Sequence, residues 1–173
     1  MIKHVFTRFG IVAAGVAAAF AGTVTQAGAA PAVHDVTPDT VAVAPAAGWD
    51  TPNDRSYYLE ASCEPYAAAI RQGAAAWNGL TEGGGTPVEC RNSYITDCGG
   101  GGNIVGCNWG QGQRIALYMG GVNDDALLAA HEFGHDWYGH SDYQCAGWGS
   151  PAEVMSPTIC NAPLARGGKL PTM

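Results

Sequence analysis

The chain has 173 residues, with 15 Asp and Glu against 8 Lys and Arg, which gives a formal net charge of −7 at pH 7. An acidic chain with a few scattered cations offers no basic surface for nucleic acid or for anionic lipid headgroups. We therefore expect no nucleic-acid partner, and no membrane partner once the N-terminal segment described next has been removed.

The N-terminal residues have the composition of a secretory signal peptide. Lys3 and Arg8 form a basic start, residues 11–21 are apolar, and residues 27–29 are small residues that favour cleavage. The apolar run is too short to span a bilayer comfortably. We expect residues 1–29 to be removed, with cleavage near Ala29 or alternatively at Ala27, and the protein to be secreted into the extracellular space.

Secretion gives the cysteines a structural meaning. An even number of cysteines in an oxidising compartment predicts three disulfides. None of the six lies in a Cys-x-x-Cys pair that would favour a cysteine zinc site. The sequence alone does not fix the pairing, but proximity along the chain favours Cys145–Cys160 and Cys98–Cys107, which leaves Cys63–Cys90.

Residues 30–54 are rich in Ala, Pro, Val, Thr and Asp and show no helical or strand periodicity. This composition predicts a disordered leader. The alternative is a short propeptide in which Asp35, Asp39 or Asp50 covers a metal. Residues 55–173 remain, about 120 residues, which suits one small domain with a single core. We expect this domain to be a monomer.

The apolar spacing of this domain predicts both helices and strands. Steps of three and four predict a helix over 63–80 that Gly79 ends, partial alternation predicts one or two strands over 86–95, and residues 114–119 form the clearest strand. Four glycines at 99–102 form a flexible loop between two cysteines. Because no Lys-Ser or Lys-Thr pair follows them, they are not a phosphate-binding loop.

An H-E-x-x-H motif begins at His131. We expect it on a helix over 123–138, whose first residues, Asn and Asp, can cap it, and residues four apart share one helix face. His131 and His135 then point at a common position, where two neutral imidazoles suit a zinc ion that keeps a water ligand. Glu132 faces that water as the general base.

The residues after the motif extend the pattern. Gly139 favours the end of the helix, and Asp142 follows three residues later. A glycine turn that returns a third ligand to the metal is the metzincin arrangement. The segment Val-Met-Ser-Pro around Met155 is similar to the Met-turn beneath such sites. With the cysteines on either side of Met155, these residues resemble the snapalysin family of small secreted metzincin-like zinc metalloproteases, over about residues 61–160 and specifically over 123–160.

The resemblance implies Asp142 as the third zinc ligand, after His131 and His135. The family pattern is H-E-x-x-H-x-x-G-x-x-D, whereas this chain has three residues between His135 and Gly139. We favour Asp142 because the G-x-x-D spacing is kept. His140 is the alternative because imidazole is a common metal ligand.

The resemblance also implies a fold. It implies a zincin-like or metzincin-like α+β domain stapled by disulfides, in which a small twisted, mostly antiparallel or mixed sheet lies with a backing helix and the helix that carries the motif. In zincin-like folds the strand before that helix, here 114–119, is an edge strand that can align an extended substrate. Met155 would form an apolar floor beneath the metal, and Tyr143 would donate a hydrogen bond to the oxyanion.

These features predict a secreted zinc endopeptidase that hydrolyses protein or peptide substrates by metal-activated water, with Glu132 as general base. Zn²⁺ is the expected cofactor. The family analogy also allows a Ca²⁺ site, although no acidic loop has the EF-hand spacing. The alternative is a secreted, disulfide-rich binding module with structural zinc or none and without proteolysis. A structural zinc site is closed and does not depend on Glu132.

Overall fold

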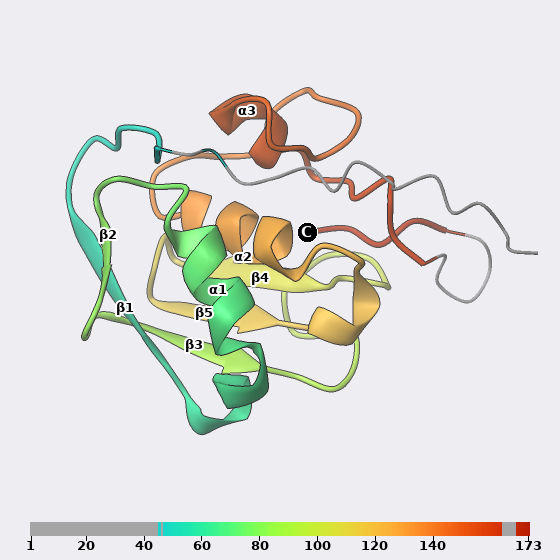
Figure 1. Ribbon diagram of the computed structural model, residues 1–173. Helices are drawn as coiled ribbons and strands as arrows, with labels where there is room; N and C mark the ends of the chain where they lie inside the picture. Colours follow the sequence, from blue (N-terminus) through green and yellow to red (C-terminus); the bar gives the residue numbers. More distant parts are fainter. Residues whose placement is uncertain (1–44, 46, 164–168) are drawn as a thin grey trace, which may run out of the picture. The chain divides into compact units, whose positions relative to one another are not determined.

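The computed structural model describes residues 45, 47–163 and 169–173, so the expected signal peptide, Asp35 and Asp39 lie outside the described residues. The strands form one mixed five-stranded sheet in the order β2-β1-β3-β5-β4 (Figure 1). Neighbouring strands are parallel except β4 and β5, which are antiparallel. The expected α+β class with a mixed sheet is confirmed. The strands are β1 Arg55–Leu59, β2 Leu80–Glu82, β3 Thr86–Cys90, β4 Gly106–Trp109 and β5 Arg114–Leu117.

The clearest predicted strand is present as β5, but it is not at the edge of the sheet. β5 lies between β3 and β4, so the expectation that residues 114–119 form an edge strand is wrong. Gly110, Gln111 and Gly112 all have positive φ, which lets the chain reverse tightly between β4 and β5. The reversal places β4, rather than β5, at the outer edge of the described sheet.

The first helical segment is shorter than its apolar pattern predicts. A 3₁₀ helix η1, Ala61–Tyr66, continues into α1, Ala67–Ala74, whereas the prediction extended to residue 80. The indole Nε1–H of Trp77 donates to the backbone carbonyl of Ala130 at 2.8 Å, and β2 begins three residues later. The apolar residues after Ala74 are therefore buried in a turn and a strand, which a helical periodicity cannot distinguish from a longer helix.

Helices α1 and α2, Asp125–Gly134, lie on the same side of the sheet (Figure 1). They pack closely at Gly73, where a Cβ atom would lie 2.5 Å from the carbonyl oxygen of Ala126. The described residues also form two shorter helices. The 3₁₀ helix η2, Met119–Gly121, precedes α2, and α3, Pro151–Val154, follows it. No helix in the described ranges is long and apolar enough to cross a membrane.

The core between the helices and the sheet consists of buried apolar side chains from most of these elements. Each such side chain contributes about 1.5–3 kcal/mol when it is fully buried. Phe133 of α2 packs against Tyr57 of β1 with ring centroids 4.6 Å apart, so the motif helix is held directly on the sheet. The largest contributors include Tyr57, Ile70, Val88, Ile115, Leu128 and Phe133.

The three disulfides are those that proximity along the chain predicts. Cys63–Cys90 joins η1 to the end of β3, Cys98–Cys107 joins the glycine loop to β4, and Cys145–Cys160 closes the segment that contains α3. In the chain-entropy picture, closing loops of these lengths stabilises the fold by roughly 3 kcal/mol each. The predicted pairing is confirmed.

The last residues of the expected leader are packed on the domain. The backbone N–H of Trp49 donates to the Ala76 carbonyl at 2.7 Å, and the N–H of Asn78 donates to the Trp49 carbonyl at 2.9 Å. The Asp50 carboxylate accepts a hydrogen bond from Asn78, and its backbone carbonyl accepts one from the Tyr138 hydroxyl. Asp50 is thus engaged by the surface of the domain.

Candidate metal centre

The motif lies on α2, which begins at a capped turn. The Asp124 carboxylate accepts the backbone N–H of Leu127 at 2.9 Å, which satisfies one of the free N–H groups at the helix N-terminus. The prediction placed this helix over 123–138, whereas α2 begins two residues later and ends four residues earlier. The first four residues of the motif are in the helix, and His135 caps its C-terminus.

The helix ends early because its last carbonyl groups find other donors. The side-chain amide of Asn108, on β4, donates to the backbone carbonyl of Glu132 at 2.8 Å. The N–H groups of Asp136 and Trp137 bond to carbonyls three residues back, which tightens the chain into a turn. Gly139 has no positive φ, so the expectation that it ends the helix in a left-handed conformation is wrong.

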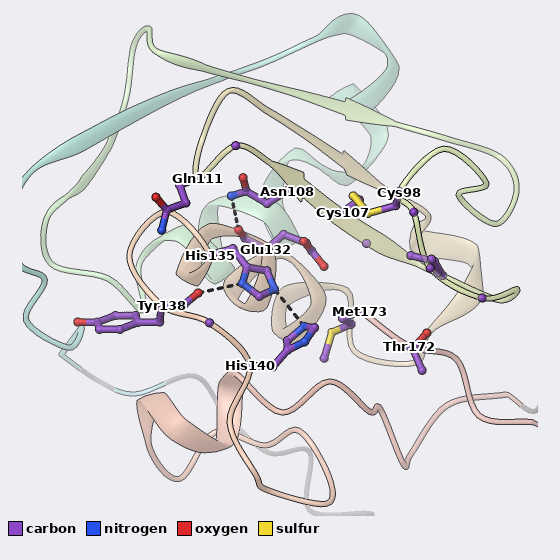
Figure 2. Close-up of a pocket in the computed structure, with 17 residues that line it drawn as sticks. Cys98, Cys107, Asn108, Gln111, Glu132, His135, Tyr138, His140, Thr172 and Met173 are labelled. Carbon is purple, nitrogen blue, oxygen red and sulfur yellow. Dashed lines mark hydrogen bonds between the residues drawn. A yellow bond between two sulfur atoms is a disulfide. The ribbon is translucent and has the colours of Figure 1, made fainter.

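Three histidines converge after this turn. One ring nitrogen each from His131, His135 and His140 lies within 4.8 Å of the other two. The Nε2 atoms of His135 and His140 are 3.2 Å apart and point toward one another (Figure 2). Among the residues that the structure describes, this is the one group of three or more potential metal ligands.

Backbone carbonyls orient two of the three rings. Nδ1 of His131 lies 2.6 Å from the Val154 carbonyl oxygen, and Nδ1 of His135 lies 2.9 Å from the Tyr138 carbonyl oxygen. A carbonyl can only accept, so each Nδ1 carries the proton and each Nε2 keeps its lone pair for a metal. Burial lowers the pKa of His131 to about 3, and it also lowers the pKa of His135 and His140. Neutral imidazoles are the form that binds a metal.

Asp142 lies outside this group. It is exposed, as is Tyr143, and the two residues line a different cavity together with Glu153. Because the chain leaves the helix after residue 134 rather than 138, residue 140 instead of 142 returns to the motif histidines. The structure therefore groups His140, the alternative ligand, with the motif in place of Asp142. Tyr143 is not among the residues that line the histidine cavity.

Glu132 lines the same cavity as His135 and His140, whose volume is about 540 Å³. Its side chain is 1% exposed, and neither carboxylate oxygen has a hydrogen-bond partner among the described residues. Burial raises the pKa of Glu132 well above its ordinary value. Gly106 of β4 faces the carboxylate so closely that a Cβ atom at this position would overlap it. Glu132 is thus enclosed between α2 and β4.

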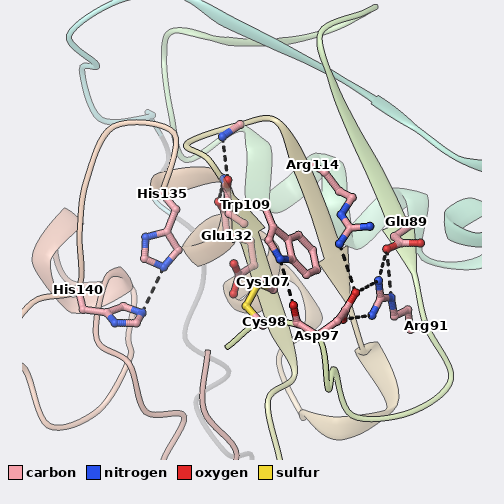
Figure 3. Close-up of a disulfide and its surroundings, with 12 residues drawn as sticks. Glu89, Arg91, Asp97, Cys98, Cys107, Trp109, Arg114, Glu132, His135 and His140 are labelled. Carbon is pink, nitrogen blue, oxygen red and sulfur yellow. Dashed lines mark hydrogen bonds and ion pairs between the residues drawn. A yellow bond between two sulfur atoms is a disulfide. The ribbon is translucent and has the colours of Figure 1, made fainter. Parts of the chain in front are cut away.

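The glycine loop forms another part of the cavity wall. The disulfide Cys98–Cys107 closes the loop close to Glu132 (Figure 3). Asp97, just before the loop, forms ion pairs with Arg91 at 2.6 Å and with Arg114 at 3.2 Å. The loop that was expected to be pinned by a disulfide is therefore anchored at both ends and borders the site.

A short segment near residue 172 completes the wall. The backbone N–H of Thr172 donates to the Asn103 carbonyl at 3.2 Å, and the Thr172 carbonyl accepts the N–H of Val105 at 2.9 Å. Thr172 and Met173 both line the histidine cavity. Their place could not be inferred from the sequence, because the pairing joins residues far apart in the chain.

Met155 packs against the end of α2. Its side chain is 2% exposed, and Gly134 leaves the space that its sulfur occupies. The Met155 carbonyl accepts the N–H of Ser141 at 2.9 Å, which fixes the segment that delivers His140. Met155 thus packs beside the end of α2 and the segment that carries His140, and its role as an apolar floor beneath a metal stays a prediction.

The pattern of unpaired atoms fits a metal ion. The buried side-chain atoms without a hydrogen-bond partner in the described ranges are Nε2 of His131, both carboxylate oxygens of Glu132 and one oxygen of Asp136. Leaving such atoms unpaired in the interior is costly. A cation held by the three imidazoles would satisfy His131 directly and would place a positive charge near Glu132. The residues present therefore fit a divalent metal that prefers nitrogen ligands.

Comparisons with protein-family models, curated proteins and solved structures find no match to this chain. The resemblance to the snapalysin family therefore remains a prediction based on the residues around the motif. Two residues next to Glu132, Gly106 and Asn108, were not predicted as part of the site. No local pattern marks them, because they reach Glu132 only through the pairing of β4 with β5.

The close contact at Gly106 leads to a first prediction. Gly106→Ala should lower the free energy of unfolding by about 1–3 kcal/mol, because the new methyl group must displace the Glu132 carboxylate or β4. Denaturant unfolding measures this change. Gly101→Ala is the control, since a Cβ atom at Gly101 meets nothing within 4 Å. Equal effects of the two substitutions would contradict the packing of β4 on Glu132.

Proposed function

We propose that this chain is a secreted zinc-dependent endopeptidase. The observation that carries the proposal is the convergence of three neutral imidazoles beside a buried carboxylate that has no other partner among the described residues. Three histidine ligands leave a zinc ion one open position for water, and a carboxylate in the same cavity can act as general base. The H-E-x-x-H spacing serves this purpose in zinc proteases.

Each residue has a defined part in this reaction. Zinc, when bound, lowers the pKa of a coordinated water and polarises the carbonyl group to be attacked. His131, His135 and His140 hold the ion as neutral ligands, and backbone carbonyls orient the first two. Glu132 accepts a proton from the attacking water and donates it to the amine that leaves. A cation bound beside Glu132 would favour its carboxylate form, which is the form that can accept the proton.

The proposed substrate is an extended segment of a peptide or protein. β4 is an edge strand, and its residues Gly106, Cys107 and Asn108 line the cavity beside Glu132. An extended peptide can add to such an edge through main-chain hydrogen bonds. We therefore assign to β4 the substrate-aligning role that the sequence suggested for residues 114–119.

Secretion belongs to the proposal as well. Three disulfides, which involve every cysteine of the chain, suit an oxidising compartment. We do not extend the proposal to a Ca²⁺ site, because the described residues contain no second group of three or more His, Cys, Asp or Glu ligands.

The test compares metal content and casein hydrolysis in the purified wild type and in Glu132→Ala. Both should contain one equivalent of zinc, and hydrolysis by the variant should be lower by about 10²–10⁴-fold, the usual contribution of a general base. Glu60→Ala, which removes an exposed carboxylate, is the control and should keep full activity. Zinc without hydrolysis in the wild type would favour the binding module with structural zinc. Absence of zinc would refute the proposal.

A further inference from the structure

Asn108 links the edge strand to the residue proposed as general base. Its side-chain amide donates two hydrogen bonds of 2.8 Å, one to the backbone carbonyl of Glu132 and one to the Asp136 carboxylate. Its side-chain oxygen accepts the backbone N–H of Gly112 at 2.7 Å. The half-buried side chain of Asn108 therefore connects the β4–β5 turn to Glu132, inside the end of α2, and to Asp136, just beyond it.

The connection is itself rigidly held. Thr86 of β3 donates its hydroxyl to the Gly112 carbonyl at 2.6 Å. Gly112 has φ +95°, and a Cβ atom there would lie 2.8 Å from a carboxylate oxygen of Asp136. Position 112 thus needs glycine both for its backbone conformation and for its approach to α2. The bonds of Asn108 therefore connect two elements that have little freedom of their own.

β4 contacts Glu132 at two points. Asn108 holds its backbone carbonyl, and Gly106, two residues earlier on the same strand, packs against its carboxylate. On its other side β4 pairs with no further strand of the described sheet, and Thr172 bonds to Val105 just before the strand begins. The strand that can align a peptide is therefore also the strand that fixes the position of Glu132.

We infer that Asn108 is a positioning residue that holds Glu132 in a fixed geometry relative to a peptide bound along β4. This inference rests on the proposed function. It implies that binding energy gained along β4 improves the alignment of the peptide bond with Glu132, so longer substrates gain in kcat as well as in KM. A residue that merely capped the helix would not couple the length of the substrate to kcat.

The kinetic test uses two peptides with the same cleaved bond, a short blocked peptide and one extended on both sides so that it can pair with β4. In the wild type, extension should raise kcat. In Asn108→Ala, extension should still lower KM, but kcat on the long peptide should fall by about 10–100-fold, the effect of a small misplacement of a catalytic group. Zinc content should stay at one equivalent. Persistence of the full kcat gain in Asn108→Ala would overturn the inference.

Backbone amide hydrogen exchange gives a readout that needs no turnover. Loss of the Asn108 bonds should accelerate exchange of the amides of residues 136–138 by about fivefold, since a net hydrogen bond contributes about 1 kcal/mol. Asn108→Asp, which keeps the shape and the acceptor for Gly112 but not the donors, should have the same effect and serves if Asn108→Ala does not fold. Unchanged exchange in both variants would refute the positioning role.

Asn123→Ala is the matched control. Asn123 lies just before the other end of α2 and donates its side-chain amide to the Asn161 carbonyl at 3.0 Å, away from Glu132. It should change neither the exchange of residues 136–138 nor the effect of substrate length. If the wild type cleaves neither peptide, the proposed function fails and the coupling to substrate fails with it. The exchange result still decides whether Asn108 holds the end of α2.

Discussion

His140→Ala should abolish stoichiometric zinc binding, whereas Asp142→Ala should leave it intact. The ring of His140 completes the group of three nitrogens, with its Nε2 atom 3.2 Å from that of His135. Removal of a hydrogen-bond partner of a zinc ligand alone costs about 10–100-fold in affinity, so removal of a ligand should cost more than about 100-fold. Competition with a chromogenic chelator at neutral pH measures both affinities.

This experiment separates the ligand set of the structure from that of the family resemblance. Asp142 is exposed and lines another cavity, so its carboxylate has no part in the histidine group. Hydrolysis should follow zinc content in both variants. If Asp142→Ala loses the metal and His140→Ala keeps it, the ligand set inferred from the resemblance holds and the grouping of the three histidines does not.

The part of the site that follows from local pattern could be predicted. The spacing of His131 and His135, with Glu132 between them, is a property of a few consecutive residues, and the helix that carries them needs only a capping Asp and apolar residues on its inner face. Two of the disulfides, Cys98–Cys107 and Cys145–Cys160, also followed from short separations, and Cys63–Cys90 followed as the pair that remained. The motif, the helix cap and the two short disulfide loops are each decided by residues close together in the sequence.

The position of His140 beside the motif histidines depends on a contact that the sequence does not display. Asn108 lies 24 residues before Glu132, yet it bonds to the carbonyl of Glu132 near the end of α2. A helix that continued to residue 138 would have favoured a later returning residue, and the shorter helix favours His140. The same limitation applies to Trp49, whose pairing with Trp77 makes part of the expected leader belong to the domain.

Glu132→Gln should remove activity and, at the same time, stabilise the metal-free protein above about pH 4.5, by an amount that grows as pH rises. In the wild type, burial raises the pKa of Glu132 well above its ordinary value of 4.5. Between pH 4.5 and the raised pKa, the Glu132 side chain keeps its proton in the native state but has lost it in the unfolded state. The free energy of unfolding therefore falls as pH rises through this range, by up to about 1.4 kcal/mol per pH unit. Glutamine carries no such proton, so the fall should disappear.

Protonation of the buried His131 changes the free energy of unfolding in the opposite direction, at lower pH. Burial lowers the pKa of His131 from 6.5 to about 3, so between these values the unfolded state binds a proton that the native state does not. Stability from this group rises with pH up to 6.5 and is lost as pH falls toward 3. The metal-free wild type should thus be most stable between about pH 4.5 and 6.5, where the two effects overlap. Above pH 6.5 the effect of His131 has ended, while that of Glu132 continues.

Denaturant unfolding of the metal-free proteins at pH 4.5 and pH 8 measures the difference. Glu132→Gln should unfold at a higher denaturant concentration than the wild type at pH 8, while the two should be similar at pH 4.5. Glu60→Gln is the control for loss of a carboxylate, because Glu60 is exposed. Equal stability of wild type and Glu132→Gln at pH 8 would contradict an uncompensated buried carboxylate. Saturating zinc should stabilise the wild type at pH 8, because zinc binds only the native site and places a positive charge beside the Glu132 carboxylate. The carboxylate proposed as the general base is then the group that lowers the stability of the metal-free protein at high pH.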